Sequence, residues 1–396
     1  MKVLQVNTVY PSGSTGKMIQ EIHKALLASG HSSVIVYGRG ETSSAEEAVR
    51  LCPNFYGQMQ SMLSRITGLR YGGCRLSTNR LIRMIRQENP DLVHLHSIND
   101  HFVNIYQLIS WLKEQRIPTV ITLHAEFFYT ANCSHAMDCG KWKNGCGHCP
   151  RAAEAARTWF LDRTAESWKR MYNSFQGMEQ NCVLVPVSPW VEERALQSPI
   201  LNRIPMQTIL NGINTDTFFM RQVKDPKKKT VFHATAYFSD QKDHPKGGWH
   251  VLQLAERMTD VQFVVAGRYK EGMRVPENVM LLGNVSEQEK LAEFYASADL
   301  TLLTSKRETF SMPCAESLCC GTPVVGYRAG GPECIALKEY SEFVEYGNTE
   351  LLERCVRKWL MKNDIQKTDL AHRAKLRFSG DRMTGEYLAL YSQMLN

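Results

Sequence analysis

Arg307-Glu308-Thr309-Phe310-Ser311-Met312-Pro313-Cys314-Ala315-Glu316 is the stretch that decides the fold. It follows a short apolar run, 299–304, that predicts a buried strand. Pro313 suits the first turn of a helix, and Gly321 closes that helix before a second strand begins near Pro323. The stretch therefore predicts a strand, a loop and a helix N-terminus, which is one unit of a parallel α/β sheet.

A carboxylate stands near each end of this loop, at Glu308 and Glu316. Backbone N–H groups at a helix start carry partial positive charge and suit a diphosphate, whereas carboxylates accept hydrogen bonds from sugar and ribose hydroxyls. The unit is therefore typical of a nucleotide-sugar site. An ordinary crossover helix beside a solvated loop is the alternative interpretation.

The spacing of the two carboxylates resembles the E-x7-E signature of retaining glycosyltransferases of the GT-B fold, in glycosyltransferase family 4. The segment 310–313 stands where that family usually has F-G-L-P, and Cys-Gly-Thr-Pro-Val-Val at 320–325 and Gly-Gly-Pro-Glu at 330–333 follow in the family's order. The resemblance implies an α/β fold with two doubly wound Rossmann-like domains facing a cleft. It also implies retaining transfer of a hexose-type sugar from a nucleoside-diphosphate sugar.

Size and composition agree with two globular domains. The chain has 396 residues, of which 43% are apolar and 22% charged, so disorder is excluded. It starts with a strand-like segment and has no run of about 18 apolar residues, so we expect neither a signal peptide nor a membrane span. The 12 cysteines are then expected to be reduced thiols in the cytoplasm.

The formal net charge of +7 is concentrated in part at 58–87, which holds six arginines and no Asp or Glu. These arginines alternate with apolar residues, which predicts a basic amphipathic surface for anionic lipid headgroups or a lipid-linked pyrophosphate. The protein would then be peripheral on the cytoplasmic face of the inner membrane. A solvated helix face is the alternative, and nucleic acid is not expected because no binding motif accompanies the charge.

The N-terminal half opens with a predicted strand, 2–10, and a small-residue turn that contains Gly13 and Gly16, before a helix. The turn has neither P-loop nor dinucleotide-fingerprint spacing. By resemblance, Gly16 lies beside the donor phosphates and Gly13 beside the acceptor; plain turn glycines are the alternative. Two later strands, 90–96 and 118–124, end in His96 and His124, which places both at the predicted crevice.

His124 stands where the family has T-x-H-D, but Ala125 follows it here. The resemblance gives His124 a positioning role in catalysis, and Glu126 is the residue that could replace the missing acid. His96 and His124 are both expected on the acceptor side.

Four cysteines follow, Cys133, Cys139, Cys146 and Cys149, within the insertion 132–150. Their C-x5-C-x6-C-x2-C spacing predicts a structural zinc site, with unmetallated thiols as the alternative. The insertion resembles those of colanic acid and exopolysaccharide biosynthesis glycosyltransferases. Beyond it, 151–176 predicts one long helix, and 184–190 a strand, an N-cap and a new helix.

The domain junction is expected near residue 220. The segment 209–218 matches N-G-[IV]-[DN]-x3-F at the junction of these enzymes, and the polar run 224–229 predicts an exposed linker. We therefore expect an N-terminal acceptor-side domain at 1–219, a C-terminal nucleotide-sugar domain at 220–377, and a helix at 378–396 that crosses back to the first domain.

Lys246 follows the first strand of the second half, 230–234, where the family's lysine holds the donor diphosphate. A fixed cation there stabilises the charge that gathers on a leaving diphosphate. The family's arginine, usually about six residues earlier, is missing, and Lys242 or Arg268 could compensate.

The resemblance assigns the remaining roles in donor binding. Glu316 would bind ribose hydroxyls, Glu308 the donor sugar, and the backbone around Phe310, Ser311 and Met312, together with Lys246, the diphosphate. His124, Lys246 and Glu308 are the catalytic candidates, and no cofactor or catalytic metal is required. The expected acceptor is a lipid-linked glycan of exopolysaccharide, capsule or O-antigen synthesis; a nucleotide-sugar epimerase and a non-catalytic assembly subunit are the alternatives.

Overall fold

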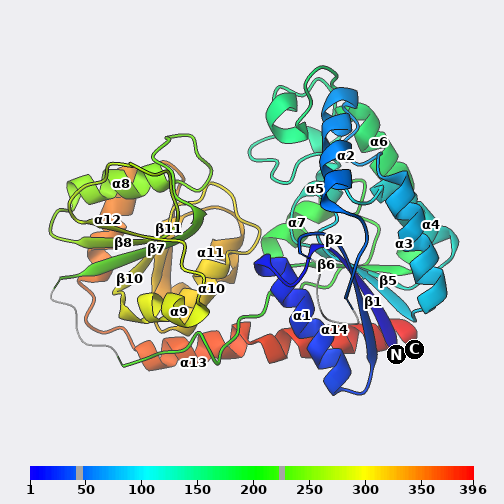
Figure 1. The fold of residues 1–396 in the computed structure, drawn as a ribbon. Helices are drawn as coiled ribbons and strands as arrows, with labels where there is room; N and C mark the ends of the chain where they lie inside the picture. Colours follow the sequence, from blue (N-terminus) through cyan, green and yellow to red (C-terminus); the bar gives the residue numbers. More distant parts are fainter. Residues whose placement is uncertain (42–47, 223–227) are drawn as a thin grey trace. The chain divides into compact units, whose positions relative to one another are not determined.

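The computed structural model describes residues 1–41, 48–222 and 228–396 (Figure 1). Contacts divide the chain into two compact units, Met1–Ile209 with Thr384–Asn396, and Leu210–Met383. Each unit is built on one parallel sheet of six strands, so the predicted α/β fold with two Rossmann-like domains is confirmed.

The first sheet has the strand order β3-β2-β1-β4-β5-β6, which is the doubly wound order. Its strands are β1 (Lys2–Val9), β2 (Ser32–Arg39), β3 (Ala48–Arg50), β4 (Leu92–Leu95), β5 (Thr119–Leu123) and β6 (Cys182–Pro186). The middle strands are buried along almost their whole length because helices cover both faces. The strand order reverses between β1 and β4, where ligands of such sheets bind.

The helices of the first unit connect these strands, and α2 lies at the end of the unit remote from the two chain termini (Figure 1). They are α1 (Gly13–Ala28), α2 (Asn54–Thr67), α3 (Arg75–Glu88), α4 (Ile105–Glu114), α5 (Phe127–Thr130), η1 (Lys141–Lys143), η2 (Ala152–Ala156), α6 (Thr164–Phe175), η3 (Met178–Gln180) and α7 (Pro189–Leu196). Most of α14 (Gly380–Leu395) also belongs to this unit.

The second sheet repeats the same winding, in the order β12-β11-β10-β7-β8-β9, with its reversal between β7 and β10. Its strands are β7 (Thr230–Tyr237), β8 (Gln262–Arg268), β9 (Val279–Gly283), β10 (Leu300–Leu303), β11 (Val324–Tyr327) and β12 (Ser341–Val344). Its helices are α8 (Gly248–Arg257), α9 (Gln288–Ser297), α10 (Met312–Cys319), α11 (Gly331–Ile335), η4 (Lys338–Tyr340), α12 (Thr349–Leu360) and α13 (Lys367–Phe378).

Two local predictions are wrong. The segment 151–176 is not one helix, because Asp162 accepts hydrogen bonds from the backbone and hydroxyl of Thr164 and so starts α6 there. Gly13 and Gly16 lie in the first turn of α1 rather than in a turn before it. The helix expected at 378–396 is α14, and α13 ends just before it, where Ile213 exchanges backbone hydrogen bonds with Phe378 and Gly380.

The compact units divide at 209/210 and 383/384, whereas the sequence places its domain limits at 219/220 and 377/378. Residues 224–227 of the predicted linker lie outside the described residues, and 228 and 229 are exposed. None of the helices in the described part of the chain is both long and apolar enough to cross a membrane.

Candidate active site

Lys246 and Glu308 meet at the switch point of the second sheet. Lys246 lies in the loop between β7 and α8, and Glu308 in the loop after β10, the strand that pairs with β7. The Lys246 Nζ lies 2.7 Å from Glu308 Oε1, and both side chains are partly exposed. The fold thus brings together two residues that lie far apart in the sequence and that were both predicted to bind donor.

A close backbone approach makes this contact possible. Gly247 has a φ of 68°, and a Cβ on it would lie 2.0 Å from the carbonyl oxygen of Thr304. Only glycine fits there without moving the backbone. The Lys306 N–H then donates to the carbonyl of Pro245 at 2.8 Å, so that the two loops run against each other.

The backbone of Glu308 is held by the Gly-Gly-Pro-Glu segment. Its N–H donates to the carbonyl of Ala329 at 3.0 Å, and its carbonyl accepts from Gly331 at 2.8 Å. A Cβ on Gly331 would lie 2.5 Å from the carbonyl of Thr309. The Glu333 carboxylate accepts from the N–H groups of Ala329 and Gly330, so this glutamate supports the loop that carries Glu308.

Ser311 begins α10 in a left-handed conformation, with a φ of 81°. Its hydroxyl accepts a hydrogen bond from the N–H of Cys314 at 3.4 Å, and Pro313 occupies the first turn, as predicted. The family's usual glycine at this position matches the left-handed region, and a serine there is strained, as residues at functional sites often are. Phe310 is buried, with its ring against Phe378, whereas Met312 is partly exposed.

Glu316, on α10, is held by a tyrosine that the sequence analysis missed. The Tyr295 hydroxyl, on α9, donates to Glu316 Oε2 at 3.0 Å. Burial, and then the Glu316 charge, raise the pKa of Tyr295 well above its usual value, so this hydroxyl stays a donor. Its ring packs edge-on against Phe232. A tyrosine on the apolar face of 288–297 was the only signal.

In the first unit, His96 and His124 lie together at the carboxyl ends of neighbouring strands. His96 Nδ1 is 3.2 Å from His124 Nε2, and the two rings are stacked. Burial lowers the pKa of both, that of His124 to about 3, so both imidazoles are neutral at neutral pH. The Nε2 of His96 is buried without a hydrogen-bond partner among the described residues.

A polar chain behind these histidines reaches the last helix. The His94 ring is tilted against that of His96, with 3.7 Å between ring centroids, and its Nδ1 lies 2.7 Å from the Tyr391 hydroxyl. His94 Nε2 lies 2.7 Å from Thr122 Oγ1, which in turn lies 2.9 Å from the Tyr387 hydroxyl. Tyr387 and Tyr391 stand four residues apart on α14, a helical spacing that could have pointed to one shared role.

The glycines of α1 lie at the same sheet edge as His96. Asn7, at the end of β1, donates to Val9 O and to Thr15 Oγ1, and accepts from the N–H of Ser97 after β4. A Cβ on Gly16 would lie 2.9 Å from the backbone of Pro11, so Gly16 permits a tight start of the helix. The structure thus gathers the start of α1 and the residues after β4 at the first switch point.

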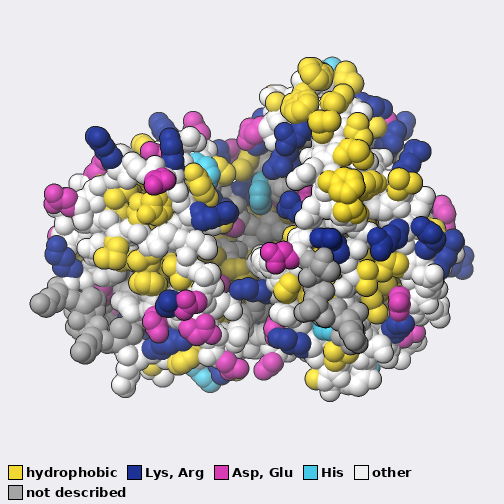
Figure 2. Space-filling model, viewed as in Figure 1, with side chains coloured by type: hydrophobic (Ala, Val, Ile, Leu, Met, Phe, Trp, Pro, Cys, Tyr) yellow, Lys and Arg dark blue, Asp and Glu magenta, His cyan; other side chains and the backbone are white. Residues whose placement is uncertain are grey.

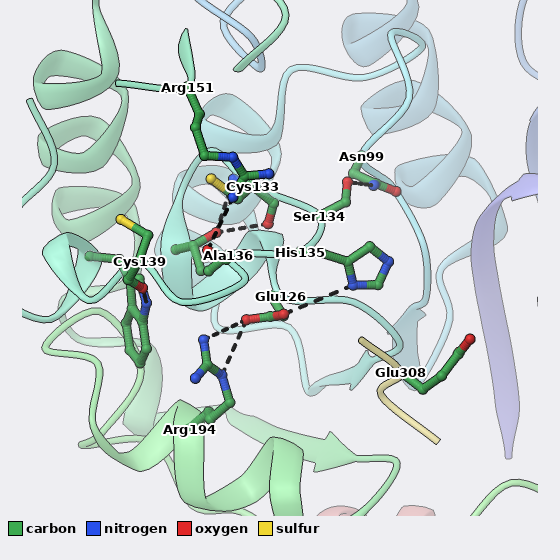
Figure 3. A network of polar contacts seen from close by, with 12 residues as sticks. Asn99, Glu126, Cys133, Ser134, His135, Ala136, Cys139, Arg151, Arg194 and Glu308 are labelled. Carbon is green, nitrogen blue, oxygen red and sulfur yellow. Dashed lines mark hydrogen bonds and ion pairs between the residues drawn. The ribbon is translucent and has the colours of Figure 1, made fainter. Parts of the chain in front are cut away.

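Glu126 is not free to replace the acid that is missing beside His124. Its side chain is fully buried, and Oε2 accepts from Arg194 Nε at 3.1 Å and Nη2 at 2.7 Å. His135 Nδ1 lies 3.9 Å from the other oxygen (Figure 3). The carboxylate is therefore committed to Arg194, and the suggestion that Glu126 substitutes for the family's aspartate is not supported.

The four cysteines of the insertion are free thiols. Burial is the main reason that the pKa of Cys133 rises to about 12, and the charges of the other three thiols raise it further, so the four side chains lie near one another. Across 1–41, 48–222 and 228–396, no three His, Cys, Asp or Glu side chains are arranged to hold a metal ion. The zinc site therefore stays a prediction from the spacing.

Two residues were suggested as replacements for the missing arginine. The Lys242 ammonium lies over the ring of Trp249, 5.5 Å from its centroid. Arg268 ends β8 and is exposed. Within the described part of the chain, neither forms a hydrogen bond or an ion pair with Lys246 or Glu308, so the compensation stays a prediction.

Comparison with known families covers nearly the whole chain. The model described as Glycosyltransferase Family 4 matches residues 15–217, more than half of the chain, and the model described as Glycosyl transferases group 1 matches residues 216–377. The chain belongs to glycosyltransferase family 4. Its resemblance to that family, first drawn from the motif at 308–333, is confirmed.

Individual relatives of this family 4 glycosyltransferase are distant but full-length. The protein named "Putative colanic acid biosynthesis glycosyl transferase WcaC" of Escherichia coli K12 is 21% identical over 100% of both chains. Sucrose-phosphate synthase of Thermosynechococcus elongatus superposes with a TM-score of 0.69 at 15% identity, covering 100% and 99% of the two chains. HepE of Anabaena, solved with UDP, superposes with a TM-score of 0.64 at 13% identity, covering 99% of this chain and 100% of HepE. Its complex with UDP-glucose superposes with a TM-score of 0.60 at 14% identity, with the same coverage of the two chains.

Proposed function

We propose that this glycosyltransferase moves a hexose-type sugar from a nucleoside-diphosphate sugar to a glycan acceptor, with retention of anomeric configuration. The contact between Lys246 and Glu308 at the second switch point carries the proposal. A fixed ammonium there stabilises the negative charge of a departing diphosphate, and the start of α10 adds its partial positive charge. Glu308 would accept hydrogen bonds from the donor sugar, and Glu316, oriented by Tyr295, from the ribose.

The reaction balances without a protein nucleophile. The bond from the sugar C1 to the diphosphate oxygen breaks, and the acceptor oxygen bonds to C1 from the same face. The acceptor hydroxyl gives its proton to the departing phosphate. His124, neutral at neutral pH, would accept a hydrogen bond from an acceptor hydroxyl and so orient it. The charge that the reaction requires comes from Lys246 and the helix start, so the proposal needs no metal.

Relatives support the donor class and the pathway. The HepE structures contain UDP and UDP-glucose, which favours a nucleoside-diphosphate donor. The name of the Escherichia coli relative favours a role in exopolysaccharide synthesis, and by extension in capsule or O-antigen synthesis. We further propose that the acceptor is lipid-linked and that the basic stretch 58–87, which forms α2 and α3, contacts the inner membrane from the cytoplasm.

Nucleotide binding tests the proposal. We expect one of UDP, GDP, ADP and CMP to raise the melting temperature, because a ligand at about 100 times its Kd adds about 2.7 kcal/mol. Glu316→Ala should abolish this shift, whereas the control Glu289→Ala, an exposed glutamate of α9, should keep it. Absence of any shift would favour the non-catalytic assembly subunit. Turnover of the donor without an acceptor, to an epimeric nucleotide sugar, would favour the epimerase.

A further inference from the structure

A cavity of about 690 Å³ opens at the carboxyl edge of the first sheet. Its walls come from the end of β1, the end of β2, the loop after β4, helix α2 and the segment 157–159. Doubly wound sheets bind ligands at this edge, and His96 lies at the same edge, directly after β4. The roles proposed above for the first unit assign no ligand to this cavity.

Arginine side chains dominate the charge of the cavity. Arg39, Arg65 and Arg157 line it, and Asp100 is the only acid among its described lining residues. Asp100 pairs with Arg39 at 2.6 Å, whereas in the described part of the chain no carboxylate pairs with Arg65 or Arg157. Two guanidinium groups therefore remain for a ligand.

A buried arginine adds to this positive charge. Arg70 is 8% exposed, and its guanidinium donates to the carbonyl oxygens of Asn132 and Ala155 rather than to a carboxylate of the described residues. Its charge reaches His101, which lines the cavity. The pKa of His101 is lowered to about 4, mainly by burial and then, among the nearby cations, most by Arg70. A buried cation without a counter-ion is costly, and an anion nearby would offset that cost.

An exposed apolar strip borders the cavity. It consists of one face of α2 and a neighbouring turn, with side chains 39–77% exposed: Phe55, Met59, Met62, Leu63, Ile66, Trp159, Phe160 and Leu161. The N–H of Trp159 donates to the carbonyl of Arg65 at 2.8 Å, which joins the turn to the helix. Figure 2 shows hydrophobic side chains gathered over α2. Exposed apolar surface of this extent marks a binding face.

We propose that the cavity and the apolar strip together bind a lipid-linked diphosphate, with the diphosphate between Arg65 and Arg157 and the hydrocarbon chain along the strip. The inference rests on the proposed function, because it names the acceptor that the first unit would take. A phospholipid phosphodiester carries one negative charge, whereas a diphosphate carries more and matches two guanidinium groups. A cavity beside an apolar face fits an amphiphile whose head is larger than a single phosphate.

Vesicle binding tests the charge match. The probes are phosphatidylcholine vesicles that contain either geranylgeranyl diphosphate or phosphatidylglycerol, at equal total negative charge. We expect the full-length protein to bind the diphosphate vesicles at least about tenfold more tightly, and free pyrophosphate to compete. Equal affinity for both vesicles would show a general anionic-membrane surface and would overturn the proposal, as would no binding to either.

Matched variants locate the site. Arg65→Gln and Arg157→Gln should each weaken binding to the diphosphate vesicles about tenfold. Arg203→Gln, which removes an exposed arginine of the first unit outside both the cavity and the stretch 58–87, should not. Phe160→Ser should weaken binding to the same vesicles, whereas Met361→Ser should not, although the two side chains are 77% and 74% exposed. Equal losses in the variants and their controls would contradict the assignment.

Nucleotide stabilisation of the same wild-type preparation separates the two proposals. Diphosphate binding without any nucleotide shift would leave the cavity assigned and the donor site refuted. A nucleotide shift without preference for diphosphate vesicles would do the reverse.

Discussion

Lys246 depends on a glycine for its position, because Gly247 lets its loop touch the backbone at Thr304. The role proposed for its ammonium is one that the family shares between a lysine and an arginine. We expect Lys246→Gln to lower the turnover number at least about 100-fold, as loss of one preorganised charge at a departing group does. The turnover number for the donor sugar is measured for both variants, and Lys242→Gln is the matched control. An equal loss in Lys242→Gln would move the diphosphate contact to Lys242.

Tyr295 gives a second test at the scale of one atom. Tyr295→Phe removes the hydroxyl that donates to Glu316 and leaves the ring against Phe232. A hydrogen bond to a charged group contributes about 1.5–3 kcal/mol, so we expect the donor KM to rise about tenfold or more. Tyr340→Phe removes a comparable hydrogen bond to Asp369 and should leave the KM unchanged. An unaltered KM in Tyr295→Phe would separate Glu316 from donor binding.

The strand-end histidines make the stability of the first unit depend on pH. Burial holds their folded-state pKa values below the usual histidine value of about 6.5, so the unfolded chain takes up protons first as the pH falls. Their stabilisation is therefore complete above about pH 6.5 and is lost progressively below it, down to about pH 3 for His124.

Each neutral histidine contributes a slope of up to about 1.4 kcal/mol per pH unit below its unfolded pKa. We expect His124→Asn to flatten the pH dependence of the unfolding free energy by about that amount, and the exposed His372→Asn not to change it. Denaturant melts between about pH 7 and about pH 5 would measure both. An unchanged slope in His124→Asn would show that this imidazole is charged in the folded protein.

The cysteine insertion carries a metal prediction. If zinc closes it, protein purified without a metal-binding tag should contain about one zinc per chain, and Cys149→Ser should lose it. Binding must displace thiol protons, and burial raises the pKa of Cys133 and Cys146 to about 12, so uptake should increase with pH. Cys334→Ser, at an exposed thiol, serves as the control. A zinc content below about a tenth of an equivalent per chain would contradict the structural zinc site.

Elements set by their own sequence were predictable, and elements set by distant partners were not. Apolar runs predicted β1, β4, β5 and β10, and the order of the motif predicted the loop that carries Glu308 and the helix α10 that follows it. The break of 151–176 depends on Asp162, and the burial of Glu126 depends on Arg194, 68 residues away. Tyr295 and Tyr391 form hydrogen bonds with groups that only the fold brings near. Periodicity carries no information about such pairs.

At the scale of the molecule, the chain has two compact units, and its last helix belongs mainly to the first. Tyr387, Leu390 and Tyr391 are at most 3% exposed there, and the two tyrosine hydroxyls lie within hydrogen-bond distance of Thr122 and His94. The donor residues proposed above, Lys246, Glu308 and Glu316, all lie in the second unit. Removal of the last helix should therefore lower the stability of the first unit and leave nucleotide binding by the second unit unchanged.

Deletion of 384–396 should destabilise the first unit by more than about 5 kcal/mol, because it removes several buried side chains and leaves two polar groups unpaired. Calorimetry should then show one transition lowered by at least about 10 °C, while the nucleotide still raises the other. Deletion of 395–396, which are exposed, is the control and should change neither. Loss of the nucleotide shift in the longer deletion would mean that the helix also sustains the donor site, and that the two units do not act independently.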